Sequence, residues 1–124
     1  MKYKNILHID DDLDDCELFH DALSSFSNAR YTAFTDPVAA LHLLQAQQVS
    51  PDVIIVDLNM PTVNGMEFLS EVKRMVHLEH VPVIIFSTCG RPDSAQKALT
   101  LGADEYWIKP ANFNSLISVL RHKL

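Results

Sequence analysis

Residues 53–61 constrain the fold more than any other stretch, because they have the sequence VIIVDLNMP. Four consecutive β-branched residues without polar alternation are typical of a strand that is buried on both faces at the centre of a parallel sheet. Asp57 follows directly, so a single carboxylate lies where this strand ends. Ligands of parallel α/β sheets bind at the carboxyl ends of the strands, which makes Asp57 a candidate for chemistry. A plainer interpretation, that Asp57 only begins a turn or caps a helix, stays open on this evidence.

Composition points to one globular domain over residues 1–124. The chain has a formal net charge of -6 and a pI near 5.3, with 48% hydrophobic and 21% charged residues. An acidic chain without a basic cluster is a poor binder of nucleic acid or of anionic membranes. The sequence has no signal peptide and no stretch that approaches the length of a membrane span. We therefore expect a cytoplasmic protein in which Cys16 and Cys89 are free thiols.

Strand and helix signals alternate along the whole chain. The expected strands are 4–9, 30–34, 53–57, 81–86 and 105–108. Helices are expected after each strand; Asp36 and Pro37 open the second, and Gly102 ends the fourth. The helical residues expected to face inward are Leu13, Leu18, Phe19, Ala22, Leu23, Val38, Leu41, Leu44, Met66, Leu69, Val72, Met75 or Val76, Phe113, Leu116, Ile117 and Leu120.

This alternation predicts an α/β fold: a doubly wound, five-stranded parallel sheet of order 2-1-3-4-5 between two helical layers, the flavodoxin-like three-layer sandwich. Asp10 and Asp11 end the first strand and Asp57 ends the third, so the three carboxylates should meet where the strand order reverses. Like charges this close repel by roughly several kcal/mol, so they call for a cation. Oxygen ligands suit Mg²⁺, which completes its shell with water and phosphate.

Two further strand ends supply groups that a phosphoryl site needs. Ser87 closes the fourth strand with a hydroxyl donor, and Lys109 closes the fifth with a compact ammonium group. Each has a plain alternative, since a serine after a strand is usually a turn residue and a lysine before proline is usually a solvated charge. The acidic residues Asp14 and Asp15 are accounted for by the dipole of the first helix. The convergence of all these groups on one edge is what favours a site.

Taken together, these motifs resemble the receiver domain of two-component response regulators. The matching segments cover nearly the whole chain: the acidic pair at 10–11, VDLNMP at 56–61 with Gly65 beyond it, the serine–threonine strand end at 87–88, and GADEYWIKP at 102–110. Their combination and order are far more specific than any one of them. The resemblance implies a signalling protein, not an enzyme of ordinary turnover, that catalyses its own phosphorylation and dephosphorylation.

The resemblance also implies roles for the acidic residues. Asp57 would be the phospho-acceptor, attacking a phosphohistidine or a small phosphodonor. Asp11 would bind Mg²⁺ directly and Asp10 would support it, while the backbone carbonyl of Asn59 would be a further protein ligand beside Asp57. Asp12 extends the acidic pair and would face the first helix.

The remaining implied roles concern the fourth and fifth strand ends. Ser87 and Lys109 would contact the phosphoryl oxygens, and Lys109–Pro110 would be a cis peptide that aims the lysine inward. The Ser87 hydroxyl would be drawn to the phosphoryl group and Tyr106 would turn inward behind it, which is a two-state switch. Without the family, packing alone would explain Tyr106.

The expected partners are proteins. A sensor histidine kinase or a phosphotransfer protein would supply the phosphoryl group, and a downstream protein would sense the switch. Only one helix follows Lys109, so we expect a stand-alone response regulator. LDDCELF at 13–19 and HLEHVP at 77–82 resemble the stand-alone receivers found with phytochrome-type kinases. A homodimer through the fourth helix, fifth strand and fifth helix (the 4-5-5 face) stays open.

Two other classes of function also stay open. An aspartyl-nucleophile phosphohydrolase of the haloacid dehalogenase type uses Mg²⁺ and an acyl phosphate, and Asp10 and Asp12 do form a D-x-D after the first strand. The surroundings of Asn59 and the absence of a cap insertion speak against it. The other class is a receiver-like binding module that is never phosphorylated. The intact set of acidic, hydroxyl and lysine residues argues against that class.

Overall fold

The strands and helices follow the alternation expected from the sequence. The computed structural model describes residues 3–124. Its strands are β1 (Asn5–Ile9), β2 (Arg30–Phe34), β3 (Val53–Asp57), β4 (Val83–Ser87) and β5 (Glu105–Ile108). Its helices are α1 (Leu13–Ser24), α2 (Pro37–Gln45), α3 (Gly65–Lys73), α4 (Pro92–Thr100) and α5 (Phe113–Lys123), with a short 3₁₀ helix, η1 (Val76–Leu78), before β4.

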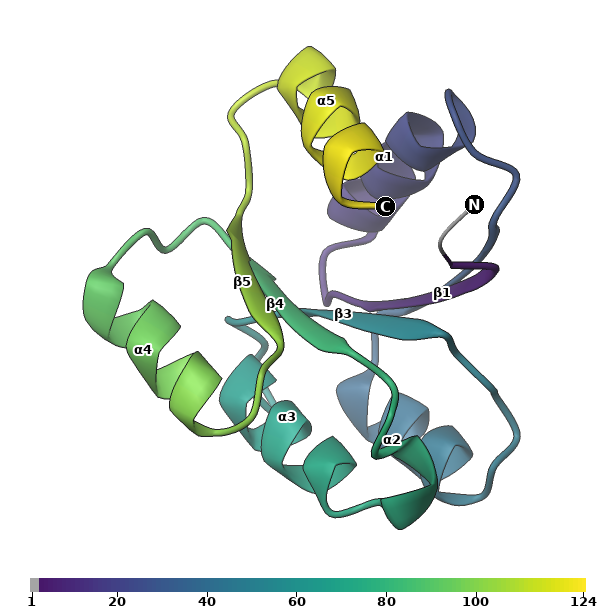
Figure 1. Ribbon diagram of the computed structural model, residues 1–124, viewed down its shortest axis with the longest axis vertical. Coiled ribbons are helices and arrows are strands. Elements are labelled where there is room, and N and C mark those ends of the chain that lie inside the picture. Colours follow the sequence, from purple (N-terminus) through teal and green to yellow (C-terminus); the bar gives the residue numbers. More distant parts are fainter. Residues whose placement is uncertain (1–2) are drawn as a thin grey trace.

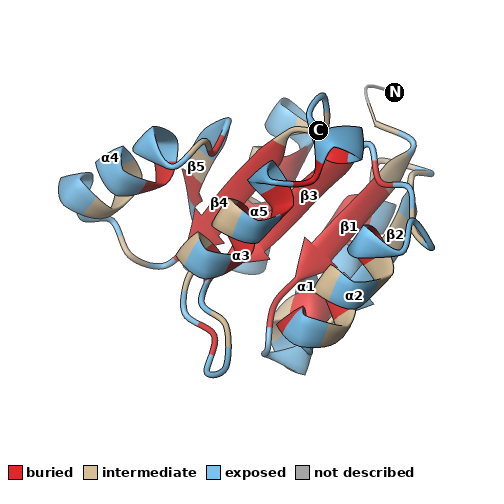
Figure 2. Ribbon diagram, turned by 90° about the horizontal axis from the view of Figure 1, so that it is seen from below, coloured by how far each residue is buried: buried red, intermediate tan, exposed pale blue. Residues whose placement is uncertain are grey.

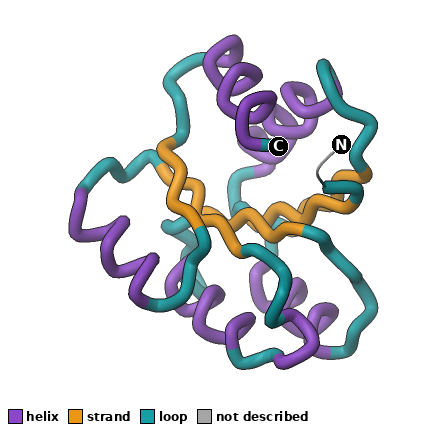
Figure 3. Tube along the Cα trace, in the orientation of Figure 1, coloured by secondary structure: helices purple, strands orange, loops and turns teal. Residues whose placement is uncertain are grey.

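The strands form one parallel sheet in the order β2-β1-β3-β4-β5. Figure 1 shows α1 and α5 on one side of this sheet and α2, α3 and α4 on the other. In Figure 3 the strands run as a single band between the two helical layers. The predicted doubly wound fold and its strand order are confirmed. Of the helices formed by residues 3–124, none combines the length and the apolar character needed to cross a membrane.

The central strand β3 is buried along its whole length, as its β-branched sequence predicts. Side chains alternate across a strand, so Ile54 and Val56 pack with α2, α3 and α4, whereas Val53 and Ile55 pack with α1 and α5. Figure 2 shows the buried strands in the interior beneath helices whose outer faces are exposed. Burying a Val or Ile side chain contributes roughly 1.5–3 kcal/mol. Asp57 therefore stands at the end of a firmly held strand.

Four helices begin with side-chain caps just beyond the carboxyl ends of strands. Asp12, Asp36, Asn64 and Asn112 each accept hydrogen bonds from backbone N–H groups in the first turn that follows. In α3, Glu67 also accepts from the backbone N–H of Asn64 at 3.1 Å, which completes a capping box. A cap of this kind stabilises a helix by about 1 kcal/mol. These helix N-termini open toward the carboxyl edge of the sheet.

Some residues expected to face the core are instead exposed, and these are Leu13, Leu18, Val38 and Phe113. Three of them lie in the first turn of a helix, next to a connecting loop, where the sheet does not cover them. Leu18 is displaced because its neighbour Phe19 takes the inward direction. Of the two candidates after α3, Met75 is buried and Val76 is exposed. The apolar stripes of α1, α2 and α5 are therefore narrower than their sequences suggested.

Candidate functional site

Four strands end at one edge of the sheet and place polar side chains there. The pairing of β1 with β3 brings Asp10 level with Asp57. The pairing of β4 with β5 sets Lys109 just beyond Ser87. Residues from widely separated parts of the sequence therefore meet at the carboxyl edge, where parallel sheets carry their ligand sites.

Three carboxylates cluster at this edge. Asp10, Asp11 and Asp57 each offer one oxygen, and these atoms lie within 4.8 Å of one another. Asp10 is 0% exposed and Asp57 is 7% exposed, while Asp11 is open to solvent. Asn59 lies two residues beyond Asp57 and is exposed. Oxygen ligands at this spacing suit a small hard divalent cation that keeps part of its water shell.

The loop after Asp57 is held against the start of α3. The backbone N–H of Gly65 donates to the carbonyl of Leu58 at 2.8 Å. A Cβ atom on Gly65 would lie 2.8 Å from Leu58 Cα and would press on the backbone oxygen of Asp57. Only glycine allows this approach, so Gly65 sets the path of the loop that carries Asn59.

The positive charge of Lys109 offsets the negative charge of the carboxylate cluster. Its Nζ donates to Asp10 Oδ2 at 2.8 Å and to Asp15 Oδ2 at 3.0 Å, and lies 3.3 Å from Asp57 Oδ1. The expected cis peptide is wrong, because Lys109–Pro110 is trans. The trans form is favoured before proline by about 0.5–1 kcal/mol, and the long lysine side chain reaches all three carboxylates from it. These neighbours raise the pKa of Lys109, although its burial acts in the opposite direction.

Burial and mutual repulsion perturb the two enclosed carboxyls. Burial, followed by the negative charge of Asp10, raises the pKa of Asp57 to about 6, although Lys109 opposes the shift. Burial also raises the pKa of Asp10, again against the effect of Lys109. A bound divalent cation would favour the ionised forms of both groups. Strongly perturbed carboxyls in a cluster of this kind are typical of functional sites.

A hydrogen-bonded unit around Cys89 joins β4 to β5. Ser87 is buried, and its Oγ accepts from the backbone N–H of Cys89 at 3.0 Å. The Tyr106 hydroxyl donates to the carbonyl oxygen of Cys89 at 2.6 Å. Cys89 Sγ lies 3.4 Å from Ser94 Oγ, and this contact lowers the pKa of the Cys89 thiol. The backbone of Cys89 is therefore bound at its N–H group by Ser87 and at its carbonyl group by Tyr106.

Two residues at this edge were not assigned to the site from the sequence. Asp15 was attributed to the helix dipole, yet its carboxylate accepts a hydrogen bond from Lys109 Nζ at 3.0 Å. His8, in β1, is the second of these residues. Its Nδ1 is paired with the Tyr31 hydroxyl at 2.7 Å, but its buried Nε2 has no partner among the described residues. Strand alternation places His8 on the same face as Asp10, which is the signal for this residue.

Comparison with known proteins identifies this arrangement. A family model described as the response regulator receiver domain matches residues 6–121. The chain belongs to this family. The predicted resemblance is thus confirmed, and receiver domains are signalling domains that interact with histidine kinases or phosphotransfer proteins.

This receiver domain has relatives of very different lengths. It is 33% identical over 122 residues to the two-component response regulator ORR12 of Oryza sativa subsp. japonica, a match that covers 98% of this chain and 99% of that protein. It is 38% identical over 81 residues to a protein-glutamate methylesterase/protein-glutamine glutaminase of Trichodesmium erythraeum, where the match covers 64% of this chain and 22% of that protein. The receiver thus matches both a protein of similar length and part of a much longer one.

Solved structures agree with the fold. The phosphorylated cyanobacterial phytochrome response regulator RcpA superposes with a TM-score of 0.88 at 28% identity, covering 98% of this receiver domain and 91% of that chain. The Mn²⁺-bound form of response regulator Rcp1 superposes with a TM-score of 0.85 at 26% identity, covering 96% and 90% of the two chains. Both comparisons confirm the flavodoxin-like receiver fold.

Proposed function

We propose that residues 1–124 act as a stand-alone, cytoplasmic response regulator in which Asp57 accepts a phosphoryl group from a sensor histidine kinase or a phosphotransfer protein. The observation that carries this proposal is the position of Asp57. It ends a buried strand beside two other carboxylates, and Lys109 Nζ lies 3.3 Å from its Oδ1. This arrangement provides a nucleophile, a metal-ligand set and a cation for phosphoryl oxygens in one place.

The chemistry uses groups that the chain already positions. A carboxylate oxygen of Asp57 attacks the phosphorus of a phosphohistidine, the phosphorus–nitrogen bond breaks, and its electron pair returns to the imidazole. The product is an acyl phosphate on Asp57. Lys109 offers its charge to the transferred oxygens, since it already lies beside the nucleophile. Attack of water on the same phosphorus releases inorganic phosphate and restores the carboxylate.

The acidic cluster fits Mg²⁺, which is the expected cofactor. Asp10, Asp11 and Asp57 would hold it together with the backbone carbonyl of Asn59, since hard oxygen donors within one small space are what this ion requires. When bound, Mg²⁺ would supply positive charge to the phosphoryl oxygens and relieve the repulsion among the carboxylates.

The signal would leave the site through Ser87 and Tyr106. The Ser87 hydroxyl now binds the backbone N–H of Cys89, and Tyr106 binds the carbonyl of the same residue. A phosphoryl group on Asp57 would compete for the Ser87 hydroxyl, so it would disturb the Cys89 unit and reorient Tyr106. A downstream protein, or a second copy of the chain, would then sense the changed face of α4, β5 and α5. We expect this target to be a protein, because a net charge of -6 makes the chain a poor binder of nucleic acid or of anionic membranes.

The rival phosphohydrolase function finds less support. Its second aspartate would have to be Asp12, but the carboxylate of Asp12 caps α1 and accepts from the backbone N–H of Asp14 at 2.9 Å. Asp12 is therefore committed to the helix and is poorly placed as a general acid or base.

Intact mass spectrometry tests the proposal. The full chain is incubated with acetyl phosphate, with and without Mg²⁺, in parallel with Asp57→Asn and with Asp14→Asn, an exposed acidic residue outside the cluster. We expect one metal-dependent phosphoryl adduct on the wild type and on Asp14→Asn, and none on Asp57→Asn. If the adduct is too short-lived to detect, beryllofluoride is added in place of the phosphodonor, and the change in Trp107 fluorescence is measured. Absence of both an adduct and a fluorescence change would indicate a receiver-like binding module.

A further inference from the structure

Three carboxylates surround the ammonium group of Lys109, and they differ in what else they are expected to bind. Lys109 Nζ donates to Asp10 Oδ2 at 2.8 Å and to Asp15 Oδ2 at 3.0 Å, and it lies 3.3 Å from Asp57 Oδ1. Asp10 and Asp57 also belong to the group that could hold a metal ion, together with Asp11. Among the described residues, Asp15 is therefore the one carboxylate that pairs with Lys109 and lies outside that group.

The backbone of Asp15 is fixed by the start of α1. Asp12 caps this helix, and its Oδ1 accepts from the backbone N–H of Asp15 at 3.4 Å. The side chain of Asp15 is 40% exposed and that of Lys109 is 13% exposed, so the pair is partly shielded from water. Such a pair is screened by salt less than a fully exposed one. The first turn of α1 therefore presents to Lys109 a carboxylate that starts from a defined position.

The direction of the Lys109 N–H bonds depends on these carboxylates. An ammonium group has three donors at the end of a flexible four-carbon stem. Its Nζ also lies 5.9 Å from the centre of the Phe86 ring, but contact with a ring is weak and does not fix the direction of a single N–H bond. Two donors are used by Asp10 and Asp15. One donor is left for the Asp57 carboxylate, 3.3 Å away.

We propose that Asp15 is a positioning residue for phosphoryl transfer: its bond to Lys109 holds the ammonium group beside Asp57, with one donor free for the oxygens of the transferred group. This inference rests on the proposed function of Asp57. The contacts of Lys109 with Asp15 and with Asp57 are present together, so Asp15 does not draw the lysine away from the nucleophile. A divalent cation at the carboxylate cluster would share the charge of Asp10, and Asp15 would then be the anchor that keeps its full charge for Lys109.

The rate of adduct formation is the first measurement. The full chain is incubated with acetyl phosphate and Mg²⁺ and followed over time by intact mass spectrometry. Asp15→Asn should slow the reaction about fivefold, the value of a partly exposed charged pair. Asp15→Glu should stay within about twofold of the wild type, because it keeps a charged acceptor within reach of the long lysine. Asp14→Asn is the matched control and should react at the wild-type rate, since it removes the same charge from an exposed position in the same helical turn.

A double variant tests whether Asp15 acts through Lys109. Lys109→Met removes the group that Asp15 is proposed to position, so adding Asp15→Asn to it should cause no further slowing. If Asp15→Asn slows the wild type and Lys109→Met by the same factor, Asp15 acts by another route and the proposal is overturned.

The mobility of Lys109 gives a readout that needs neither Mg²⁺ nor phosphorylation. In the metal-free chain, ¹⁵N relaxation of the Lys109 NH₃⁺ group should report a more mobile ammonium in Asp15→Asn than in the wild type or in Asp14→Asn. If the wild type forms no adduct, the proposed function fails, and this measurement still decides whether Asp15 holds Lys109. The proposal is overturned by unchanged mobility in Asp15→Asn, or by an adduct rate in Asp15→Asn at or above that of the wild type.

Discussion

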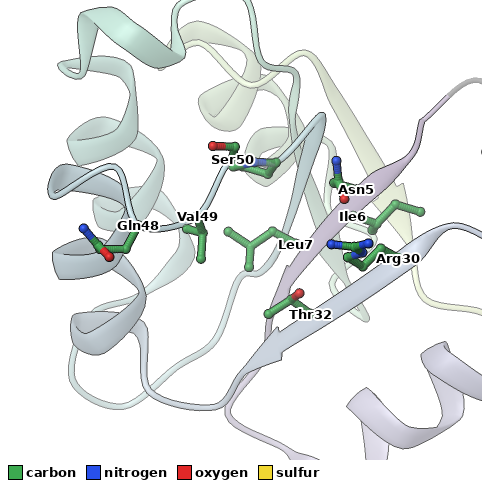
Figure 4. A pocket seen from close by; sticks show the side chains of 9 residues that line it. Asn5, Ile6, Leu7, Arg30, Thr32, Gln48, Val49 and Ser50 are labelled. Carbon is green, nitrogen blue, oxygen red and sulfur yellow. The ribbon is translucent and has the colours of Figure 1, made fainter.

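The two edges of the sheet carry cavities of different character. At the amino edge, a cavity of about 310 Å³ is lined by β1, β2 and the loop before β3, and Figure 4 shows Arg30 near Asn5 and Thr32 near Leu7. Arg30 and Thr32 are exposed to solvent. At the carboxyl edge the neighbouring cavity is smaller, about 190 Å³, but Asp10 and Asp57 are buried there beside Lys109. Buried charge, more than cavity size, marks where chemistry is located.

The direction of the strands explains the difference. All five strands are parallel, so every carboxyl end lies at one edge and every amino end at the other. The helices that follow β1, β2, β3, β4 and β5 begin at the carboxyl edge, and helix N-termini favour negative charge. An incoming phosphoryl group therefore meets a favourable backbone field at the carboxyl edge alone.

The largest expected effect separates the two edges by removing one cation from each. Lys109→Met should slow formation of the phosphoryl adduct by about 10²–10³-fold, the usual cost of losing one charge-stabilising donor. Arg30→Met should stay within about twofold of the wild type, because Arg30 is exposed and lies beside Asn5 at the amino edge, the end of the sheet opposite Asp57. The rate with acetyl phosphate is the measurement. An unchanged rate in Lys109→Met, or a large loss of rate in Arg30→Met, would contradict the claim that the chemistry is located at the carboxyl edge.

The next effect concerns backbone packing at the carboxyl edge. Gly65→Ala should lower the free energy of unfolding by about 3 kcal/mol, because the new Cβ would press on backbone atoms of Asp57 and Leu58. Gly90→Ala is the matched control, since its Cβ would meet only Ile108 Cδ1 at 3.9 Å. Urea unfolding of both variants measures the difference. Equal stabilities would show that the loop after β3 can move freely.

Asp57 should make stability depend on pH. Its pKa is raised to about 6 from 3.8, so between these values the folded state binds more protons than the unfolded state. Stability therefore falls as the pH rises from 4 to 7, by about 2 kcal/mol, and Asp57→Asn should lose this part of the fall. Urea unfolding at both pH values tests it, with Asp14→Asn as the control. A wild-type curve parallel to that of Asp57→Asn would contradict the buried-carboxyl account.

The smallest effect tests the Cys89 unit. Tyr106→Phe should lower the free energy of unfolding by about 1 kcal/mol, the value of its hydrogen bond to the Cys89 carbonyl. Combined with Ser87→Ala, it should show a coupling of at least about 0.5 kcal/mol, because both side chains hold Cys89. At the amino edge, the effects of Thr32→Val and Ser50→Ala on the free energy of unfolding should be additive. Additive behaviour at both edges would remove the basis for a Ser87–Tyr106 switch.

Much of the fold follows from local sequence. The unalternated β-branched runs of β3 and β4 demand burial on both faces, and this requires helices on both sides of a parallel sheet. Boundaries were less predictable. β4 begins at Val83 and not Val81, because the N–H of Val81 donates to the carbonyl of Leu78 at 3.0 Å and closes η1. The exposure of Leu18 depends on how α1 is rotated against the sheet, which periodicity does not determine.

The site could be predicted as far as strand ends determine it. Asp57 and Ser87 are each the last residue of a strand, and Asp10 and Lys109 are each the first residue after one. Topology alone therefore brings these four residues to one edge. The partners of long or aromatic side chains depend on tertiary packing. For that reason the contact of Lys109 with Asp15, the trans bond before Pro110 and the unpaired nitrogen of His8 emerge only from the structure.

The most direct test of the central claim is to map which carboxylate carries the phosphoryl group. After phosphorylation with acetyl phosphate and Mg²⁺, borohydride reduces an aspartyl phosphate to homoserine, and peptide mass spectrometry then locates the change. The account predicts homoserine at position 57 alone, with Asp10 and Asp11 unmodified. Homoserine at position 10 or 11, with Asp57 intact, would contradict it.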